Sequence, residues 1–339
     1  MHRSEITIDL GAVRHNVRRL LDALQGAQLW AVVKANAYAH GATDIAGAVL
    51  GAGASALCVA TVPEALALRR EFPTARIIVM GPALNREVGQ ARDAQLELVV
   101  SSDDVPPGVR VHVKLDTGMG RWGVSELFSP ALEVVGLMSH LATADTDAAY
   151  AEWQIERFRA ETAPYTHLER HIANSAGALR YPAAAFDAAR CGIAVLGLSP
   201  FGTDPSEDGL HAVLGWTSHV ALCKRLRPGQ STGYGRRFVA EADTWIGIVP
   251  VGYADGFRRD LTGTSVRVGG EPRRVIGTVS MDAFAVELEG EVPIGTPVTI
   301  IGQGVLAEQH ARAAGTIPHD FACGINTSPL RARRVVIDA

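Results

Sequence analysis

Lysine is the scarcest charged residue of this 339-residue chain. Only three of its 32 basic residues are lysine, and all the others are arginine. A chain with this bias uses arginine wherever any positive charge is sufficient. We therefore expect lysine to remain where chemistry needs an amine that can lose its proton, which arginine cannot supply. The three candidates are Lys34, Lys114 and Lys224, of which Lys224 has no motif around it.

The chain also lacks the features of several protein classes. Its four cysteines show no CxxC or CxxH spacing, which argues against a metal site or a disulfide framework. No stretch reaches the ~18 consecutive apolar residues of a membrane span, and the N-terminus has no signal-peptide pattern. A net charge of −4 gives no basic surface for nucleic acid. We expect a cytoplasmic protein that binds no metal, nucleic acid or membrane.

The first two thirds of the chain alternates apolar runs with helical patterns. The runs, several of them rich in valine and isoleucine, are typical of parallel strands buried on both faces. They are Leu29–Val33, Ala56–Ala60, Arg76–Met80, Leu96–Val100, Val111–Leu115, Val134–Met138, His171–Ala173 and Cys191–Leu198. Residues 11–24, 63–72 and 148–163 carry apolar side chains at helical spacing. The alternation predicts an α/β fold, a (β/α)8 TIM barrel, although the connection 101–108 is too short for a crossover helix.

After residue 210 the pattern changes to short β-rich segments separated by glycine, proline and aspartate turns. They are Thr217–Leu226, Thr244–Val251, Ser265–Val268, Arg274–Val279, Ala283–Leu288 and Pro297–Ile301. Short strands at this spacing are typical of an all-β domain. We therefore predict a barrel over residues 10–210 and a C-terminal β domain over residues 211–339.

Polar residues follow the predicted barrel strands at the ends where barrels carry their active sites. In chain order they are Lys34, Lys114, Asp116, His140, Asn174 and Ser175. Arg190 precedes the last predicted strand, which passes through Gly192 and Ile193. A lysine at such a strand end either reaches solvent at the rim or serves as a Schiff-base amine, and its position alone favours neither.

The residues around these positions resemble the signatures of alanine racemases. The segment AVVKANAYAHG, residues 31–41, is similar to that family's motif for the lysine that binds pyridoxal 5'-phosphate (PLP), with Ala39 where the family usually has glycine. Seven further blocks follow in the family's order: KLDTGMGR (114–121), SHLATAD (139–145), NSA (174–176), RCGI (190–193), GYG (233–235), VGYADG (251–256) and VSMD (279–282). Eight blocks in this order are not expected by chance.

The resemblance implies an isomerase, an amino-acid racemase that interconverts L- and D-alanine with PLP as cofactor. It implies a PLP-binding barrel, joined to a C-terminal β domain to which the N-terminal strand, residues 1–9, is added. It also implies a homodimer whose active sites are shared between protomers. D-alanine from this reaction would serve as a peptidoglycan precursor for a bacterial cell wall.

The same resemblance assigns catalytic roles. Lys34 would form the internal aldimine with PLP and act as one base, and Tyr234 of the other protomer would act as the second base on the opposite face of the substrate. His140 would contact Tyr234 and Arg190 would contact His140, a chain able to lower the pKa of the phenol from its usual value near 10. Arg190 would also face the pyridine nitrogen, and an arginine, which only donates hydrogen bonds, would leave that nitrogen unprotonated.

The remaining roles concern the phosphate and the substrate. The cofactor site would include Tyr38, His140, Asn174, Ser175, Gly192 and Ile193, with the phosphate on the hydroxyls and backbone amides. Substrate contacts would come from Arg121, Met281 and Tyr253. Lys114 is the lysine that this family often carbamylates, and a carbamate there would pair with Arg121. The alternatives are an Asp116–Lys114 ion pair and a helix-capping role for Ser175.

The match weakens near the C-terminus, where many members carry a tyrosine and the nearest candidate here is Thr327. A smaller hydroxyl would leave more room for the substrate, which would relax specificity, or would weaken phosphate binding. Three other functions stay open. They are a broader racemase acting on serine or lysine, a non-catalytic PLP-binding barrel protein, and a decarboxylase of the same fold type. The β domain with Tyr234 argues against the non-catalytic protein.

Overall fold

The computed structural model describes residues 2–128 and 130–338, which form two compact units. One, the barrel unit, comprises Ala12–Phe201 and Ser206–His211. The other, the β unit, comprises the chain up to Gly11, Gly202–Pro205 and the chain from Ala212 onward.

The barrel unit is built on eight parallel strands in the order β8-β7-β6-β5-β4-β3-β2-β9. The strands are β2 (Gln28–Val32), β3 (Ala56–Val59), β4 (Ile77–Val79), β5 (Glu97–Val100), β6 (Val111–Lys114), β7 (Val134–Met138), β8 (Glu169–His171) and β9 (Ala188–Cys191). The two outer strands of this order, β8 and β9, also contact each other, so the barrel is nearly closed. The predicted barrel is confirmed.

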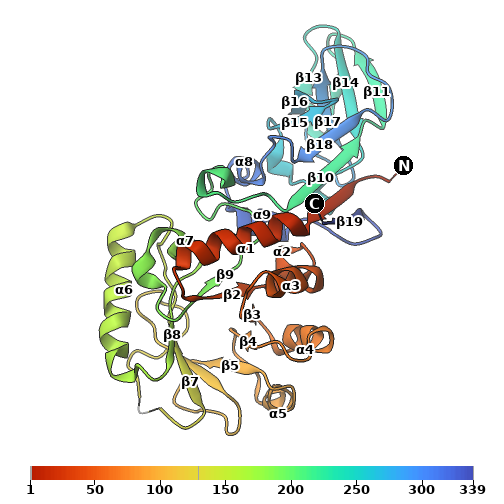
Figure 1. The fold of residues 1–339 in the computed structure, drawn as a ribbon. Coiled ribbons are helices and arrows are strands. Elements are labelled where there is room, and N and C mark those ends of the chain that lie inside the picture. The colour runs from red at the N-terminus through yellow and green to blue at the C-terminus, as the bar shows by residue number, and fades with distance from the viewer. Residues whose placement is uncertain (1, 129, 339) are drawn as a thin grey trace. The chain divides into compact units, whose positions relative to one another are not determined.

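Helices surround these strands (Figure 1). They are α1 (Leu10–Leu24), α2 (Lys34–Tyr38), α3 (Ala42–Gly51), α4 (Val62–Glu71), α5 (Val88–Asp93), α6 (Ala148–Thr162) and α7 (Ser175–Arg180). The start of α4 is a capping box, because the Thr61 hydroxyl accepts from the Glu64 N–H and the Glu64 carboxylate accepts from the Thr61 N–H. In the described residues no helix connects β5 to β6 or β6 to β7, and no helix is long and apolar enough to cross a membrane.

The predicted position of the last barrel strand was wrong. We predicted it over residues 191–198, but β9 ends at Cys191 and the residues after it form turns. Residues 193–196 are buried in these turns, and burial alone produces the same apolar run as a strand. Arg190 therefore lies inside β9. Gly192 and Ile193 follow its carboxyl end, where barrel active sites form.

The β unit contains a nine-stranded sheet in the order β11-β14-β17-β16-β15-β18-β10-β1-β19, and a small pair, β12 with β13. Its strands are β1 (Glu5–Asp9), β10 (Leu214–His219), β11 (Leu222–Leu226), β12 (Ser231–Thr232), β13 (Phe238–Val239), β14 (Thr244–Val249), β15 (Ser265–Val268), β16 (Glu271–Ile276), β17 (Phe284–Leu288), β18 (Pro297–Ile301) and β19 (Arg333–Ile337). Strand β1 pairs antiparallel with β10 and parallel with β19. The first and last strands of the chain are therefore neighbours.

Two expectations for this unit were wrong in detail. The segment predicted as one strand, 217–226, contains the end of β10 and the whole of β11, which lie far apart in the sheet order. The unit is also not purely β, since it contains α8 (Ala307–Ala313) and α9 (Pro318–Cys323). The sequence does carry signals for both helices, because α8 is rich in alanine, the best helix former, and proline occupies the first turn of α9.

Candidate active site

Lys34 begins α2, directly after the buried strand β2, in a segment with an unusual backbone. Residues 35–39 all have φ between 50° and 67°, which is the left-handed region. None of them is glycine, and each costs about 1–2 kcal/mol in this conformation. The Glu64 carboxylate helps to hold the turn by accepting the Ala35 N–H at 2.7 Å. Backbone strain of this kind concentrates at functional sites, which singles out the Lys34 segment.

Tyr38, Ser175 and Gly192 meet at the carboxyl ends of the strands. A Cβ atom on residue 192 would lie 2.6 Å from the Tyr38 hydroxyl, so the buried tyrosine needs glycine there. The Ser175 hydroxyl accepts the N–H groups of Gly192 at 3.2 Å and Ala194 at 3.4 Å. Two hydroxyls and a backbone loop that closes around them are neutral groups suited to a phosphate.

Asn174, and not Ser175, caps α7. Its side-chain oxygen accepts the Gly177 N–H at 2.9 Å, which leaves the Ser175 hydroxyl directed toward the loop after β9. The capping alternative for Ser175 is therefore not what the structure contains. Ile193, the other loop residue expected at the phosphate, is buried beside Gly192.

Arg190 is buried in β9 and makes its side-chain hydrogen bonds through its two terminal nitrogens. Nη1 donates to His171 Nδ1 at 2.7 Å and to the His171 carbonyl at 3.0 Å. Nη2 donates to His140 Nδ1 at 3.1 Å and to the carbonyls of Ser139 and Ile172 at 2.8 and 3.2 Å. Burial lowers the pKa of Arg190 to about 10, so the side chain is still a cation at neutral pH.

His140 is held in one protonation state by this contact. Burial, followed by the positive charges of Arg190 and Lys114, keeps the pKa of His140 well below its ordinary value. The ring is therefore neutral at pH 7. Because a guanidinium only donates, Nδ1 of His140 must accept, and the single ring proton lies on Nε2. His140 thus has a hydrogen-bond donor on the side of the ring away from Arg190.

Lys114 lies at the end of β6 and is only 2% exposed. Burial, followed by the charges of Arg121 and Arg190, lowers its pKa to about 8 and outweighs the opposing effect of Asp116. The Asp116 carboxylate instead accepts the backbone N–H groups of residues 118 and 120, and across the described chain no ion pair joins it to Lys114. Lys114 and Arg121 both lie over the Trp122 ring, 5.6 and 5.3 Å from its centre.

In the β unit, three predicted site residues gather around one loop, residues 277–282. Tyr234 is 73% exposed, Met281 52% and Tyr253 41%. The Thr278 hydroxyl donates to the Tyr234 carbonyl at 2.8 Å, and the Tyr253 N–H donates to the Ser280 carbonyl at 3.1 Å. Large exposed side chains grouped around one loop are typical of an interaction surface.

The segment with Thr327 packs against the turn that begins at Tyr253. The Asn326 backbone N–H donates to the Asp255 carbonyl, and its side chain donates to the Ala254 carbonyl, each at 3.0 Å. Thr327, the nearest candidate for the family's C-terminal tyrosine, therefore follows a residue that is bonded to the turn of Tyr253. Lys224, in contrast, is exposed on β11.

One residue of this centre, His171, was not predicted. It ends β8, is fully buried, and accepts a hydrogen bond from Arg190 at the distance given above. Its only signal in the sequence is a histidine at the start of an apolar run, which is more often a satisfied core residue than a site residue. The structure thus brings the barrel residues together around Arg190 and the loop after β9, and the β-unit residues together around the 277–282 loop.

Comparisons with known proteins cover the whole chain. Two family models match, alanine racemase N-terminal domain over residues 8–200 and alanine racemase C-terminal domain over residues 213–335. Alanine racemase 1 of Bacillus subtilis is 38% identical, over 94% of this chain and 90% of its own. The crystal structure of alanine racemase from Streptomyces lavendulae superposes with a TM-score of 0.92 at 34% identity, over 100% and 98% of the chains. The alanine racemase of Bartonella henselae with covalently bound pyridoxal phosphate has a TM-score of 0.88 at 25% identity, over 98% and 99%.

Proposed function

Because this chain belongs to the alanine racemase family, it interconverts L- and D-alanine, and we propose that Lys34 and Tyr234 are the two bases that move the proton. Racemisation removes a proton from one face of the substrate Cα and delivers one to the other face. Two positioned bases on opposite faces are sufficient for this. Lys34, from the barrel, would exchange the proton on one face of the substrate Cα. Tyr234, from a second copy of the chain, would exchange it on the other face.

The observation that carries this proposal is the hydrogen bond from Arg190 to His140. It fixes the His140 proton on Nε2, where the ring can donate to a phenolate oxygen. That donor would stabilise a phenolate placed beside it, as the second base requires. A tyrosine that is 73% exposed, as Tyr234 is, can reach the site of another protomer.

We assign PLP as the cofactor. The residues suited to its phosphate are Tyr38, Ser175, Gly192 and Ile193. Asn174 and His140 are the other cofactor contacts that we propose, and Lys34 would supply the amine that attaches the cofactor. When bound, PLP supplies an electron-withdrawing ring that makes the substrate Cα proton acidic. Arg190 would face the ring nitrogen, and as a group that only donates hydrogen bonds it would leave that nitrogen without a proton, which would restrain side reactions such as transamination.

We propose that Lys114 is carbamylated and orients Arg121. The neutral amine of Lys114 adds to carbon dioxide, which forms an N–C bond and releases a proton, and the resulting anion pairs with the Arg121 guanidinium. A lysine pKa of about 8 leaves a usable fraction of neutral amine at physiological pH. Arg121, with Met281, then contacts the substrate carboxylate, and Tyr253 lines the path by which substrate arrives.

The assembly follows from the two-base proposal. Tyr234 serves a second copy of the chain, so the working unit is a homodimer with shared active sites. We place it in the cytoplasm, where D-alanine would be made as a precursor of the bacterial cell wall. The domain division at residues 10–210 and 211–339, with residues 1–9 added to the β domain, is part of the same proposal.

A broader racemase is the second candidate, and the position of Thr327 favours it. The segment with this small residue packs against the Tyr253 turn, where many family members have a tyrosine. More room there would admit serine beside alanine. Activity on lysine would need still more space.

Racemisation of three amino acids tests both candidates. Purified protein loaded with PLP is incubated with L-alanine, L-serine or L-lysine, and the products are separated by chirality. We expect the wild-type protein to form D-alanine from L-alanine, and formation of D-serine or D-lysine from the other two substrates would favour the broader racemase; no product from any of the three would contradict both candidates. Tyr234→Phe should abolish racemisation while the visible absorption of the covalently attached cofactor persists, and Lys34→Ala should abolish that absorption. An inactive Tyr253→Phe variant beside an active Tyr234→Phe variant would reverse the assignment of the base.

A further inference from the structure

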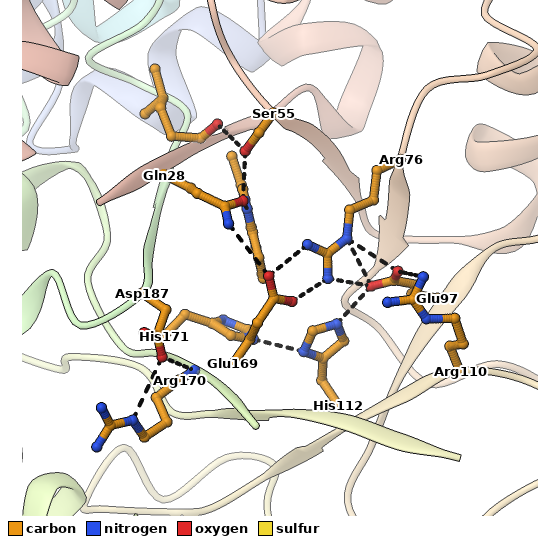
Figure 2. Close-up of polar contacts among 12 residues, drawn as sticks. Gln28, Ser55, Arg76, Glu97, Arg110, His112, Glu169, Arg170, His171 and Asp187 are labelled. Carbon is orange, nitrogen blue, oxygen red and sulfur yellow. Dashed lines mark hydrogen bonds and ion pairs between the residues drawn. The ribbon is translucent and has the colours of Figure 1, made fainter. Parts of the chain in front are cut away.

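A chain of buried polar side chains connects Arg190 to the amino ends of the barrel strands. Arg190 Nη1 lies 2.7 Å from His171 Nδ1, and His171 Nε2 lies 3.0 Å from His112 Nδ1. His112 Nε2 then lies 2.8 Å from Glu97 Oε2. All four residues are at most 3% exposed. Figure 2 shows the part of the chain from His171 through His112 to Glu97.

The direction of every hydrogen bond in this chain is fixed from both ends, because Arg190 can only donate and the Glu97 carboxylate can only accept. A guanidinium only donates, so His171 Nδ1 accepts and the proton of His171 lies on Nε2. His171 therefore donates to His112 Nδ1, and the His112 proton must lie on Nε2, from which it is donated to Glu97. Burial lowers the pKa of both histidines, most strongly that of His171, which agrees with two neutral rings.

Glu97 ends the chain as a fixed negative charge. Burial alone would raise its pKa, but the hydrogen bonds from His112 and Arg76 outweigh that effect and hold the pKa at about 2. Arg76 donates to both Glu97 oxygens at 2.8–3.1 Å, and Arg110 approaches within 3.2 Å. Among the described partners of Arg190 no carboxylate occurs, so the negative charge nearest to it along the chain is Glu97.

The surrounding residues leave room for the histidine pair and hold its rings. A Cβ atom on residue 136 would lie 2.1 Å from His112 Nδ1, the atom that accepts from His171, so Gly136 is required for this contact. The fully buried Trp30 ring packs against both imidazoles, 4.5 Å from the His171 ring centre and 5.6 Å from that of His112. Apolar side chains would fill this space at lower desolvation cost, so the polar chain calls for a function.

We propose that Glu97 and His112 are positioning residues that act through His171 on Arg190. The Glu97 carboxylate fixes the proton positions along the chain, so that Arg190 always meets an acceptor at His171 and keeps one orientation toward the cofactor and His140. The chain does not conduct protons, because Arg190 does not release one. The inference rests on the role of Arg190 in the proposed function, but the chain itself is tested separately.

Two carboxylates provide a matched pair of variants. Glu97 and Glu169 both bind Arg76 at the amino ends of their strands, and only Glu97 bonds to His112 (Figure 2). Glu97→Gln removes the fixed acceptor, since an amide can either donate to or accept from His112. Glu169→Gln removes a comparable charge from Arg76 and leaves the histidine chain intact. Gly136→Ala is a second disruptive variant, because it adds a methyl group against His112 without changing any charge.

The first measurement determines directly which ring nitrogens of the histidines are protonated. In protein labelled with ¹⁵N-histidine, the ring nitrogen signals of His112 and His171 should show Nε2-protonated neutral rings in the wild type. We expect Glu97→Gln and Gly136→Ala to shift these signals toward mixed tautomers, and Glu169→Gln to leave them unchanged. Unshifted signals in Glu97→Gln would overturn the proposal whether or not the protein racemises alanine.

The second measurement tests, through kcat and the absorption of the bound cofactor, whether Arg190 depends on the chain. We expect a roughly tenfold fall in kcat for Glu97→Gln, with little change in KM, which is the scale of coupling within one hydrogen-bond network. The visible absorption of the bound cofactor should also change in its pH dependence, whereas Glu169→Gln should match the wild type in both. If Glu97→Gln shifted the histidine signals but left kcat and the absorption unchanged, Arg190 would not depend on the chain. If kcat fell equally in Glu97→Gln and Glu169→Gln, Glu97 would be only a structural ion-pair partner of Arg76. Absence of racemisation in the wild type would contradict the proposed function instead.

Discussion

Ala39 is the last residue of the left-handed segment after Lys34, with φ of 67°. Its N–H donates to the Ala35 carbonyl at 3.1 Å, so this residue closes the turn that positions the lysine. The Cβ of an L-residue crowds the backbone in this conformation, whereas glycine adopts it without penalty. The departure from the family motif at residue 39 therefore has an energetic consequence that can be measured.

We expect Ala39→Gly to raise the free energy of unfolding by about 0.5–1 kcal/mol, since the relief of strain exceeds the extra chain entropy that glycine brings to the unfolded state. The measurement is the midpoint of urea denaturation. Ala48→Gly makes the same chemical change inside the right-handed helix α3 and should lower the stability by about 1 kcal/mol. A loss of stability in both variants would mean that the segment is not left-handed.

Lys114 gives a pH-dependent prediction at the same scale. With a pKa of about 8, roughly one tenth of the amine is neutral at pH 7 and roughly nine tenths at pH 9. Because only the neutral amine adds carbon dioxide, carbamylation at constant dissolved carbon dioxide should increase across this range. The carbamate can be detected by ¹³C NMR in ¹³C-bicarbonate. Lys114→Arg should abolish the signal and Lys224→Arg, a change at an exposed lysine, should not. A signal that persists in Lys114→Arg would place the carbamate elsewhere.

The candidate residues within motifs could be predicted from the sequence because each motif is one short continuous segment. Lys34, Lys114 and Arg190 were recognisable from their immediate neighbours. His112, His171 and Glu97 were not, because they lie on three different strands and become partners only when the barrel forms. No local pattern separates a histidine in such a chain from a histidine that is merely buried.

At the scale of elements, the turn after β9 is the segment whose structure the apolar pattern predicted wrongly. Residues 192–198 read as a strand because they are apolar, yet they fold as turns that place Gly192 against Tyr38 and Ser175. An apolar run indicates that a segment is buried, and it does not distinguish a buried loop from a buried strand of the same composition. The strands with both faces covered, in contrast, were located within one or two residues.

The same turn yields a prediction about cofactor affinity. In Gly192→Ala the new Cβ would lie 2.6 Å from the Tyr38 hydroxyl, so the tyrosine or the loop must move. Overpacking of this kind costs about 1–3 kcal/mol, and we expect PLP binding to weaken by roughly tenfold or more. Binding is followed by titrating the apoprotein with PLP and recording visible absorption. Gly89→Ala, which meets open space in α5, is the control and should bind PLP normally. Wild-type affinity in Gly192→Ala would remove this loop from the phosphate site.

At the scale of the whole molecule, the alternation of strands and helices was enough to predict a barrel followed by a β-rich part. The content of the second part was less accessible, because its short strands pair over long distances. Strand β1 joins the far end of the chain at β19, and no local signal specifies that pairing. The proposed catalytic residues are likewise divided, since Lys34 and Arg190 belong to the barrel unit and Tyr234 to the β unit.

Mixing two inactive variants tests whether the active sites are shared. Lys34→Ala and Tyr234→Phe each lack one base, so each homodimer should be inactive. In a mixed dimer, one site combines both defects, and the other combines the intact Lys34 of one protomer with the intact Tyr234 of the other. If equal amounts are unfolded together and refolded, half of the dimers are mixed and about one quarter of the wild-type sites should be active.

The matched control is a double variant with both substitutions, mixed with either single variant. None of its dimers contains a complete site under the shared arrangement, so no activity should return. Recovery near one quarter in the first mixture and none in the control would assign Tyr234 to the partner's site. If each protomer instead used its own Tyr234, neither mixture would regain activity, because every site would keep one missing base. The activity of refolded mixtures, measured by chiral separation of alanine, therefore decides between two arrangements of the same two residues.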